Sequence, residues 1–341
     1  MPPSDQLAVP APMEARLVAA LPDEPGWQFE PKWDGFRALV VRDGERIEIV
    51  SKSGKPLGRY FPEVVAMLAG LRERRFILDG ELILPVGDML SFDALQARLH
   101  PAPSRIARLS RETPAQLMLF DCLHAGDSAL DHAPLRERRA ALESFHAREH
   151  NDALLLSPCS HAPADAARWL RCSGGALDGV VAKRLDEPYR AGERAMVKVK
   201  QHRSADCVVG GIRRVKDGPA IASLLLGLYD DAGLLHHVGF TSAIAAADRD
   251  ATAAKVAALL GGTGFTGKAP GAPSRWTAGK DSPWEPLSPE LVVEVTYDQV
   301  TAARFRHGTS ILRWRPDKAP GQCRMDQLQH ELRPGELATL V

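Results

Sequence analysis

The chain is built mainly from short apolar runs rich in β-branched and aromatic residues, and the order of these runs limits the possible folds. Two of them, 35–43 and 45–53, meet at Asp43-Gly44, a dipeptide typical of hairpin turns. Up to residue 200 we expect strands at 27–33, 35–43, 45–53, 76–85, 116–123, 177–185 and 195–200, and helices at 62–73, 134–150 and 162–173. Because strands and helices do not alternate regularly, the sequence predicts an α+β domain with mixed or antiparallel sheets.

The pattern of elements changes after about residue 203. The later part is expected to contain strands at 206–215, 222–230, 234–242, 291–300 and 310–316, a helix at 248–260 and a loop at 261–276. Closely spaced strands interrupted by one helix are typical of a small OB-fold barrel. We therefore predict two domains, 1–202 and 203–341, with a boundary in the segment 201–206.

Charge and cysteine content exclude several classes of protein. The 43 Lys and Arg residues equal the 43 Asp and Glu residues, so a nucleic-acid site would have to be a local patch. The five cysteines form no CxxC pair, which argues against a disulfide framework or a structural zinc site and favours a reducing cytoplasm. Because no run of eighteen apolar residues occurs, we expect a protein that is neither secreted nor membrane-spanning.

One lysine, Lys32, stands where a strand should end, in the stretch FEPKWDGFR. The following Asp34-Gly35 predicts a tight turn into the next strand. Such a lysine is either a surface charge or a nucleophile, and a nucleophile needs neighbouring groups that favour its neutral form, since the reference pKa of lysine is about 10.4. The pattern KxDGxR alone does not decide between these two interpretations, because it is also ordinary turn composition.

Further short motifs follow in order along the chain. They are SKSGK (51–55), ILDGEL (77–82), LMLFDCL (117–123), LDGVVAKRL (177–185), MVKVK (196–200) and RWRPDK (313–318). Together with FEPKWDGFR, this series resembles the covalent nucleotidyltransferases: ATP-dependent DNA ligases, RNA ligases and capping guanylyltransferases. The longer strings from 178 to 211 and from 305 to 320 are similar to compact bacterial ATP-dependent DNA ligases of the LigC type and to the ligase module of LigD.

The resemblance implies roles for particular residues. Lys32 would attack the α-phosphate of ATP to form lysyl-AMP. The residues that would bind ATP or AMP are Phe120, which would stack on adenine, Glu30 at the adenine, Arg37 and Glu81 at the ribose, and Lys198 and Lys200, which alternate along a strand and so share one face. In the second domain, Arg313, Arg315, Asp317 and Lys318 would fold over ATP and orient the leaving pyrophosphate, then move away so that DNA can enter.

The metal and DNA contacts include two departures from the family pattern. Asp178 stands where glutamate is more frequent, and with Asp34 it would hold Mg²⁺ or Mn²⁺ through water. Lys52 stands where many DNA ligases carry arginine, and it would contact a nick phosphate as a point charge. Lys183 and Arg203 are further expected DNA contacts, because residues 183–203 carry seven basic side chains against three acidic ones.

The expected function is therefore ATP-dependent sealing of 3′-hydroxyl/5′-phosphate nicks in duplex DNA, in a repair role. One alternative is a ligase for RNA or RNA-terminated ends, and another is an end-binding module whose chemistry has decayed. About 25 residues precede the first motif, too few for an additional helical DNA-binding domain. The resemblance implies a monomer associated with the bacterial nucleoid, with end-bridging repair proteins such as Ku as candidate partners.

Overall fold

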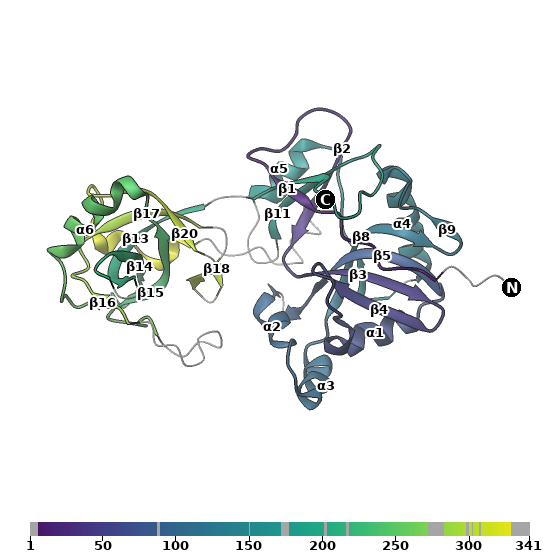
Figure 1. Cartoon of the computed structure of the whole chain (residues 1–341), viewed down its shortest axis with the longest axis horizontal. Helices are drawn as coiled ribbons and strands as arrows, with labels where there is room; N and C mark the ends of the chain where they lie inside the picture. The colour runs from purple at the N-terminus through teal and green to yellow at the C-terminus, as the bar shows by residue number, and fades with distance from the viewer. Residues whose placement is uncertain are drawn as a thin grey trace. The chain divides into compact units, whose positions relative to one another are not determined.

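The protein is described here from a computed structural model (Figure 1). The structure describes residues 6–86, 89–149, 151–171, 177–200, 203–215, 218–271, 283–297, 300–301, 303–306 and 308–328. Two compact units divide between residues 201 and 202. Within the described part of the chain, no helix is long and apolar enough to cross a membrane.

The first unit contains two sheets. A four-stranded sheet has the order β1 (Ala15–Leu17), β12 (Met196–Val199), β11 (Leu177–Arg184) and β2 (Trp27–Trp33). A six-stranded sheet has the order β10 (Leu154–Leu156), β8 (Gln116–Ala125), β5 (Arg75–Ile83), β3 (Phe36–Asp43) and β4 (Arg46–Ser51), with β9 (Ser128–Ala129) paired to β8. The helices are α1 (Pro62–Ala69), α2 (Phe92–Ala97), α3 (Pro103–Glu112), α4 (Leu135–Glu149) and α5 (Pro163–Arg171), with a 3₁₀ turn η1 (Gly58–Tyr60) and a small hairpin of β6 (Pro85–Val86) and β7 (Met89–Leu90).

Strand β3 shows why its sequence is apolar without alternation. Ala38 and Val40 pack into a core that includes residues of α1 and α4, whereas Leu39 and Val41 pack on the opposite face against Met196 of the other sheet. Both faces of this strand are therefore buried. Helix α5 covers the four-stranded sheet through its own core cluster. The layers are thus helix, sheet, sheet and helices, and the two sheets face each other.

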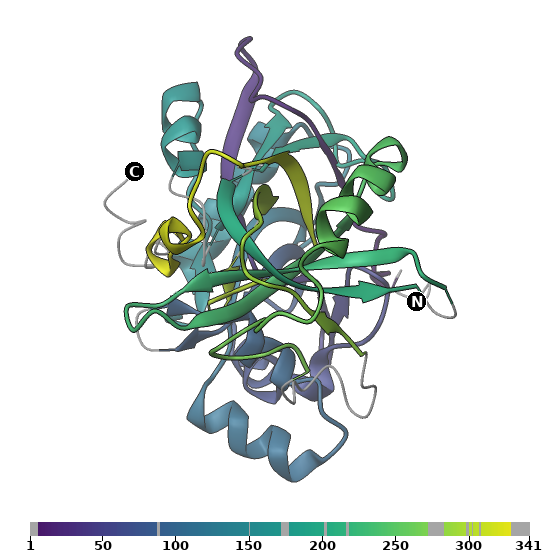
Figure 2. The ribbon, with the colours of Figure 1, turned by 90° about the vertical axis from the view of Figure 1, so that its left-hand side faces the viewer.

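The second unit is a closed barrel. Its strands are β13 (Arg203–Arg214), β14 (Ile221–Tyr229), β15 (Leu235–Ala243), β16 (Glu285–Pro286), β17 (Val292–Tyr297) and β20 (Thr309–Trp314). The pairings run β13-β14-β15-β20-β17 and return to β13, so β13 closes the ring, and β15 pairs with β20 in parallel. Figure 2 shows these green and yellow strands crossing one another. A short hairpin, β18 (Val300–Thr301) with β19 (Arg304–Phe305), helix α6 (Arg249–Ala257) and the 3₁₀ turns η2 (Ala246–Asp248), η3 (Pro320–Gln322) and η4 (Met325–Gln327) complete the unit.

The predicted fold class is confirmed: an α+β unit is followed by a five-stranded barrel of the OB type. Every expected strand and helix has a counterpart within a few residues. The helices α2 and α3 were not anticipated, and neither were the short strands β1, β6, β7, β9, β10, β16 and β19. Of the predicted loop at 261–276, residues 261–271 contain no helix or strand, and 272–276 lie outside the described residues, as do 201 and 202 of the predicted boundary. Cys122, Cys159, Cys207 and Cys323 are free thiols, and Cys172 lies outside the described residues.

Candidate active site

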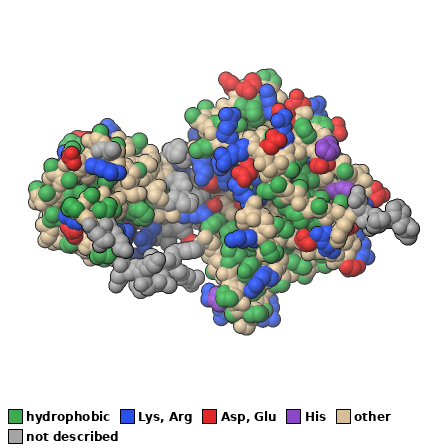
Figure 3. All heavy atoms as spheres, in the orientation of Figure 1, with side chains coloured by type: hydrophobic (Ala, Val, Ile, Leu, Met, Phe, Trp, Pro, Cys, Tyr) green, Lys and Arg blue, Asp and Glu red, His purple; other side chains and the backbone are tan. Residues whose placement is uncertain are grey.

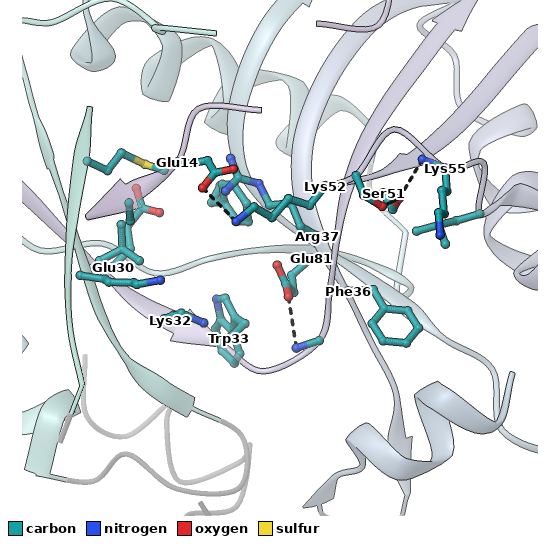
Figure 4. Close-up of a pocket in the computed structure, with 18 of the residues that line it drawn as sticks. Glu14, Glu30, Lys32, Trp33, Phe36, Arg37, Ser51, Lys52, Lys55 and Glu81 are labelled. Atoms are coloured by element: carbon teal, nitrogen blue, oxygen red, sulfur yellow. Dashed lines mark hydrogen bonds and ion pairs between the residues drawn. The ribbon is translucent and has the colours of Figure 1, made fainter. Parts of the chain in front are cut away.

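A pocket of about 1070 Å³ lies between the two sheets of the first unit (Figure 4). Strand β2, the turn after it, β3, the end of β4, β5, β8, β11 and β12 all contribute to its lining. Eight of the predicted site residues line it: Glu30, Lys32, Arg37, Lys52, Glu81, Phe120, Lys183 and Lys198. The pocket therefore gathers motifs that are separated by more than 160 residues in the sequence.

Lys32 is partly buried next to the end of β2 and is held by a carboxylate. Its Nζ atom lies 2.7 Å from Oδ2 of Asp178, whose other oxygen lies 2.9 Å from Nζ of Lys200. Burial disfavours the charged amine, but Asp178 first, and then Glu81 and Asp34, outweigh it and raise the pKa of Lys32. Without ligand, Lys32 is therefore a protonated amine with its charge balanced by Asp178.

A β-bulge directs Asp178 toward the lysine. The pairing of β11 with β2 shifts register between Leu177 and Val180. Inside this bulge Gly179 has φ +122°, and a Cβ atom there would lie 2.1 Å from the carbonyl oxygen of Val199. Only glycine fits such a position, and a bulge of this kind re-aims the neighbouring side chain. The sequence Asp178-Gly179 is thus a requirement of the local backbone as well as a source of charge.

The turn after Lys32 is tightly packed against β5. A Cβ atom at Gly35 would lie 2.1 Å from the carbonyl oxygen of Leu82, and the amide nitrogen of Gly35 donates a hydrogen bond of 3.2 Å to Oε1 of Glu81. This bond is drawn in Figure 4. Burial first, and then Asp34 and Asp79, raise the pKa of Glu81 to about 7, although Lys32 and Arg37 oppose the shift. Glu81 is therefore an acid that titrates close to neutral pH.

A buried hydrogen-bond network fixes Arg37. Its guanidinium donates to both oxygens of Asp79, at 2.7 and 2.5 Å, and to the carbonyl oxygen of Met13 at 3.0 Å. The hydroxyl of Tyr189 donates to Asp79 at 2.7 Å and accepts from the amide nitrogen of Met13 at 2.8 Å. Sequence analysis missed Asp79 and Tyr189, which are 110 residues apart. Only the position of Asp79 inside the motif ILDGEL could have drawn attention to it.

Two cations lie close to the ring of Phe120. The guanidinium carbon of Arg37 lies 4.9 Å from the ring centroid, and Nζ of Lys183 lies 4.8 Å from it. Lys183 is 3% exposed and forms an ion pair of 2.9 Å with Glu30, which also accepts a hydrogen bond of 2.7 Å from Gln28. Lys183 therefore lies in the wall of the pocket, beside Phe120. This placement makes it a candidate nucleotide contact, and its expected contact with DNA stays a prediction.

Two apolar residues of the pocket lining, Val181 and Met196, could have been predicted from strand periodicity. Val181 lines the pocket two positions before Lys183 on β11, and Met196 lines it two positions before Lys198 on β12. Side chains two positions apart on a strand share a face, so these apolar residues follow from the position of the lysines. The pKa of Lys198 is lowered by burial and by the charges of Lys32, Lys200 and Lys52.

Lys52 lies at the rim of the pocket with 56% of its side chain exposed. Its Nζ atom lies 3.0 Å from the carboxylate of Glu14, as the dashed line in Figure 4 shows. Glu14 also lies 3.8 Å from the guanidinium of Arg194. On the face drawn in Figure 3, the basic side chains of this unit are interspersed with acidic ones, in keeping with a neutral chain.

The other predicted residues lie on the barrel. Arg313 on β20 is 65% exposed and contacts Glu294 at 2.7 Å. Arg315 and Lys318 both contact Asp206 of β13, at 2.9 and 2.7 Å. Arg203 begins β13, and its Nε atom is buried without a hydrogen-bond partner among the described residues.

Two carboxylates near Lys32 are suitable ligands for a hard divalent cation. Magnesium is usually bound by one or two carboxylates, several waters and substrate phosphates. Asp178 and Asp34, which both act on the charge of Lys32, could supply those carboxylates. Among the described residues no group of three or more His, Cys, Asp or Glu side chains could hold a metal by itself. The donor set therefore fits a cation that arrives with the nucleotide phosphates.

The chain matches two family models and is similar to several known DNA ligases. Residues 6–200 match the family model of the ATP dependent DNA ligase domain, and residues 217–318 match that of the ATP dependent DNA ligase C terminal region. The chain is 46% identical over 332 residues to DNA ligase C1 of Mycolicibacterium smegmatis, and 41% identical over 339 residues to DNA ligase C of Mycobacterium tuberculosis. Each alignment covers 94% of both chains. The structure of a Lig E DNA ligase shares the fold, with a TM-score of 0.52 at 16% identity, over 89% of this chain and 100% of that one.

A partly buried lysine in a pocket between two sheets, followed in the chain by an OB barrel, defines the class of covalent nucleotidyltransferases. Within that class, the chain belongs to the family of ATP-dependent DNA ligases. The resemblance inferred from the motifs, the prediction of a ligase and the prediction of ATP as its substrate are thereby confirmed.

Proposed function

We propose that the chain seals 3′-hydroxyl/5′-phosphate nicks in duplex DNA, with Lys32 as the nucleophile that carries AMP. The observation that supports this most is the placement of Lys32. Its amine lines a pocket large enough for a nucleotide and is held by Asp178 and faced by further lysines. A solvated surface lysine would have neither the pocket nor the buried partners.

In the first step, Lys32 loses a proton to solvent, and the freed lone pair of Nζ forms a bond to the α-phosphorus of ATP. The nitrogen then loses a second proton to solvent, which leaves the neutral N–H of a phosphoramidate. The bond from that phosphorus to the bridging oxygen breaks, and pyrophosphate leaves with the electron pair. The phosphoramidate bond of lysyl-AMP keeps AMP activated for its later transfer to DNA. The protein contributes mainly position and charge, because phosphoryl transfer needs little other chemistry from it. Lys198, which lines the pocket, and Lys200, which forms an ion pair with Asp178, would neutralise the charge that develops on the phosphates.

The pocket supports a specific placement of the nucleotide. Adenine would stack on Phe120, with Glu30 and Lys183 at its edge and Val181 on the facing strand. Glu81 and the fixed guanidinium of Arg37 would contact the ribose. A divalent cation held through Asp34 and Asp178 would neutralise phosphate charge.

Two further steps complete the reaction. The 5′-phosphate at the nick attacks the phosphorus of lysyl-AMP and takes over AMP, and the lysine nitrogen leaves with its electron pair and regains a proton. The 3′-hydroxyl then attacks the 5′-phosphorus, loses its proton, and AMP departs. Lys52 at the pocket rim and Arg203 at the start of the barrel are proposed to bind DNA phosphates.

The barrel is proposed to act in the first step. Arg313, Arg315 and Lys318 supply three cations for the leaving pyrophosphate, and the segment 201–206 serves as the hinge by which the domain 203–341 approaches the domain 1–202 and withdraws. We propose that the chain works as a monomer on the nucleoid in the bacterial cytoplasm. LigD of Mycobacterium tuberculosis, named a non-homologous end joining DNA repair protein, is 29% identical over 305 residues, which cover 37% of its own length. This likeness supports a repair role and an end-bridging partner such as Ku.

The test is a sealing assay with the purified chain, ATP and Mg²⁺ or Mn²⁺. Three nicked duplexes of one sequence are compared: all DNA, one with ribonucleotides at the 3′ side, and one with ribonucleotides at the 5′ side. Faster sealing of the all-DNA nick supports the proposal. A preference for either ribonucleotide nick would favour a ligase for RNA-terminated ends. Failure to seal any of them, with no self-adenylation, would favour a binding module.

A further inference from the structure

Two acidic residues oppose each other on neighbouring strands of the barrel. Asp206 on β13 pairs directly with Glu294 on β17, and Glu294 in turn pairs with Arg313 on β20. Two carboxylates directly across a strand pair repel each other unless a cation lies between them. The guanidinium of Arg315 supplies that cation, because its Nη1 atom lies 2.9 Å from Asp206 and 3.8 Å from Glu294.

Asp206 binds both cations that follow β20. Its Oδ1 and Oδ2 atoms accept hydrogen bonds of 2.9 and 3.1 Å from Arg315, and Oδ2 also accepts one of 2.7 Å from Nζ of Lys318. Asp317 holds the other edge of the same guanidinium, with Nη2 at 2.8 Å. The two cations are thus tied to one carboxylate at a fixed spacing.

The backbone of Asp206 is held in place by the side chain of Gln327. The side chain of Gln327 accepts a hydrogen bond of 3.1 Å from the amide nitrogen of Asp206 and donates one of 3.3 Å to its carbonyl oxygen. Asp206 is 9% exposed as a residue, while the side chains of Arg315 and Lys318 remain 18% and 22% exposed. Asp206 is therefore the more buried partner, and the side chains of Arg315 and Lys318 remain partly accessible to solvent.

We infer that Asp206 is a positioning residue, which holds Arg315 and Lys318 as one unit that binds the departing pyrophosphate. The inference rests on the proposed function of these cations in self-adenylation. A guanidinium has five N–H donors and an ammonium has three. The bonds to Asp206 and Asp317 leave donors on each cation for phosphate oxygens. Holding such donors before the reaction lowers the cost of ordering them in the transition state.

The test is the variant Asp206→Asn, which keeps the shape of the side chain and removes its charge. Enzyme freed of bound AMP by incubation with pyrophosphate is mixed with [α-³²P]ATP, and the initial rate of self-adenylation is measured. The reverse reaction of the adenylated enzyme with pyrophosphate passes through the same transition state. We expect both rates to fall about 10- to 100-fold, the loss typical of a misplaced catalytic contact.

Sealing of a nick that already carries 5′-AMP involves no pyrophosphate, so Asp206→Asn should seal this substrate within about threefold of the wild-type rate. Asp206→Glu keeps the charge and should recover part of the lost rate. Gln327→Ala removes the side chain that holds the backbone of Asp206, so self-adenylation and its reversal by pyrophosphate should both slow, but less than in Asp206→Asn. The matched control is Asp231→Asn, which removes another ion pair of this unit, with Arg324, and should leave both rates unchanged.

Three outcomes would overturn the inference. Self-adenylation by Asp206→Asn at or above the wild-type rate would mean that the carboxylate is inert or restrains the cations. Equal loss of adenylation and of sealing, with a lower melting temperature, would mean that Asp206 only stabilises the barrel. If Asp206→Asn does not fold, Gln327→Ala decides the question, and equal loss of both activities in that variant would refute the inference. Failure of the proposed function would differ, because the wild-type protein would then take up no label at Lys32.

Discussion

The Nζ atom of Lys32 lies 2.7 Å from Oδ2 of Asp178. This ion pair raises the pKa of the proposed nucleophile and so favours its unreactive, protonated form. The same carboxylate is also a candidate ligand of the divalent cation. One residue would thus control both the charge of the amine and the binding of the metal, and the two effects can be separated by experiment.

Asp178→Asn removes the carboxylate and keeps its shape. We expect self-adenylation at saturating Mg²⁺ to fall on the order of 100-fold, because a charge that offsets a divalent cation is lost. The rising part of the pH-rate curve should also move to lower pH, since Asp178 no longer raises the pKa of Lys32. Initial rates from pH 6 to 10 in Mg²⁺ and in Mn²⁺ measure both effects. Asp178→Glu should retain activity, and a near-normal Asp178→Asn variant would contradict the role of the charge.

Glu81→Gln tests the electrostatics of the pocket through stability. The pKa of Glu81 rises to about 7 in the folded protein, from an ordinary 4.5. The folded state therefore binds this proton more tightly than the unfolded state, and stability from this group is full below about pH 4.5 and is lost as the pH rises through about 7. Urea unfolding should show wild type and variant alike at pH 4, with the variant more stable by on the order of 3 kcal/mol at pH 8.5. A constant difference at both pH values would contradict this.

Lys183 and Lys52 form a matched pair of lysines, one buried and one exposed. Lys183→Met leaves Glu30 without its cation, and we expect a loss of roughly 3 kcal/mol in the free energy of unfolding, together with slower self-adenylation. Lys52→Met should leave stability unchanged and lower the salt dependence of binding to nicked DNA by about one phosphate contact. Salt titrations of DNA binding for both variants decide the assignment. A reduced slope for Lys183→Met alone would support the predicted DNA contact of Lys183 and contradict its placement at the nucleotide.

Tyr189→Phe removes one hydroxyl from the network around Arg37. Asp79 loses a buried hydrogen bond, so we expect a destabilisation of about 1 to 2 kcal/mol and a higher KM for ATP. Tyr229→Phe is the control, because the hydroxyl of Tyr229 forms no hydrogen bond to another described residue and its loss should matter little. Chemical unfolding and ATP titrations of the two variants are compared. An unchanged KM for Tyr189→Phe would show that the network has no role in nucleotide binding.

Local sequence patterns predicted most of the secondary structure of this protein and its family, but few of its tertiary contacts. The hairpin at Asp43-Gly44 and the strand β3 were predicted from short-range sequence, and the order of the motifs identified the family. Helices α2 and α3 escaped prediction because they bury few apolar residues, with Ile106 as the one buried residue of α3. Helix α2 has only six residues, which is too short to show a helical period. Helix α3 is amphipathic but mostly polar, and its pattern was overlooked.

Contacts across the chain were not accessible from sequence. Asp206 is 109 residues from Arg315, and Tyr189 is 110 residues from Asp79, so no spacing rule connects them. Lys183 shows a different limit. A count of basic residues assigned it to a DNA surface, whereas the alternation of β11 would have placed it beside Val181 inside the pocket.

The central claim is that Lys32 carries AMP, and transfer of label from [α-³²P]ATP to the protein tests it most directly. Wild type and Lys32→Ala, both shown by circular dichroism to be folded, are incubated with labelled ATP and Mg²⁺ and then denatured. We predict acid-labile label on the wild type, located by mass spectrometry at Lys32, and none on Lys32→Ala. Lys32→Arg should also take up none, because a guanidinium stays protonated. Label that persists on Lys32→Ala would contradict the account.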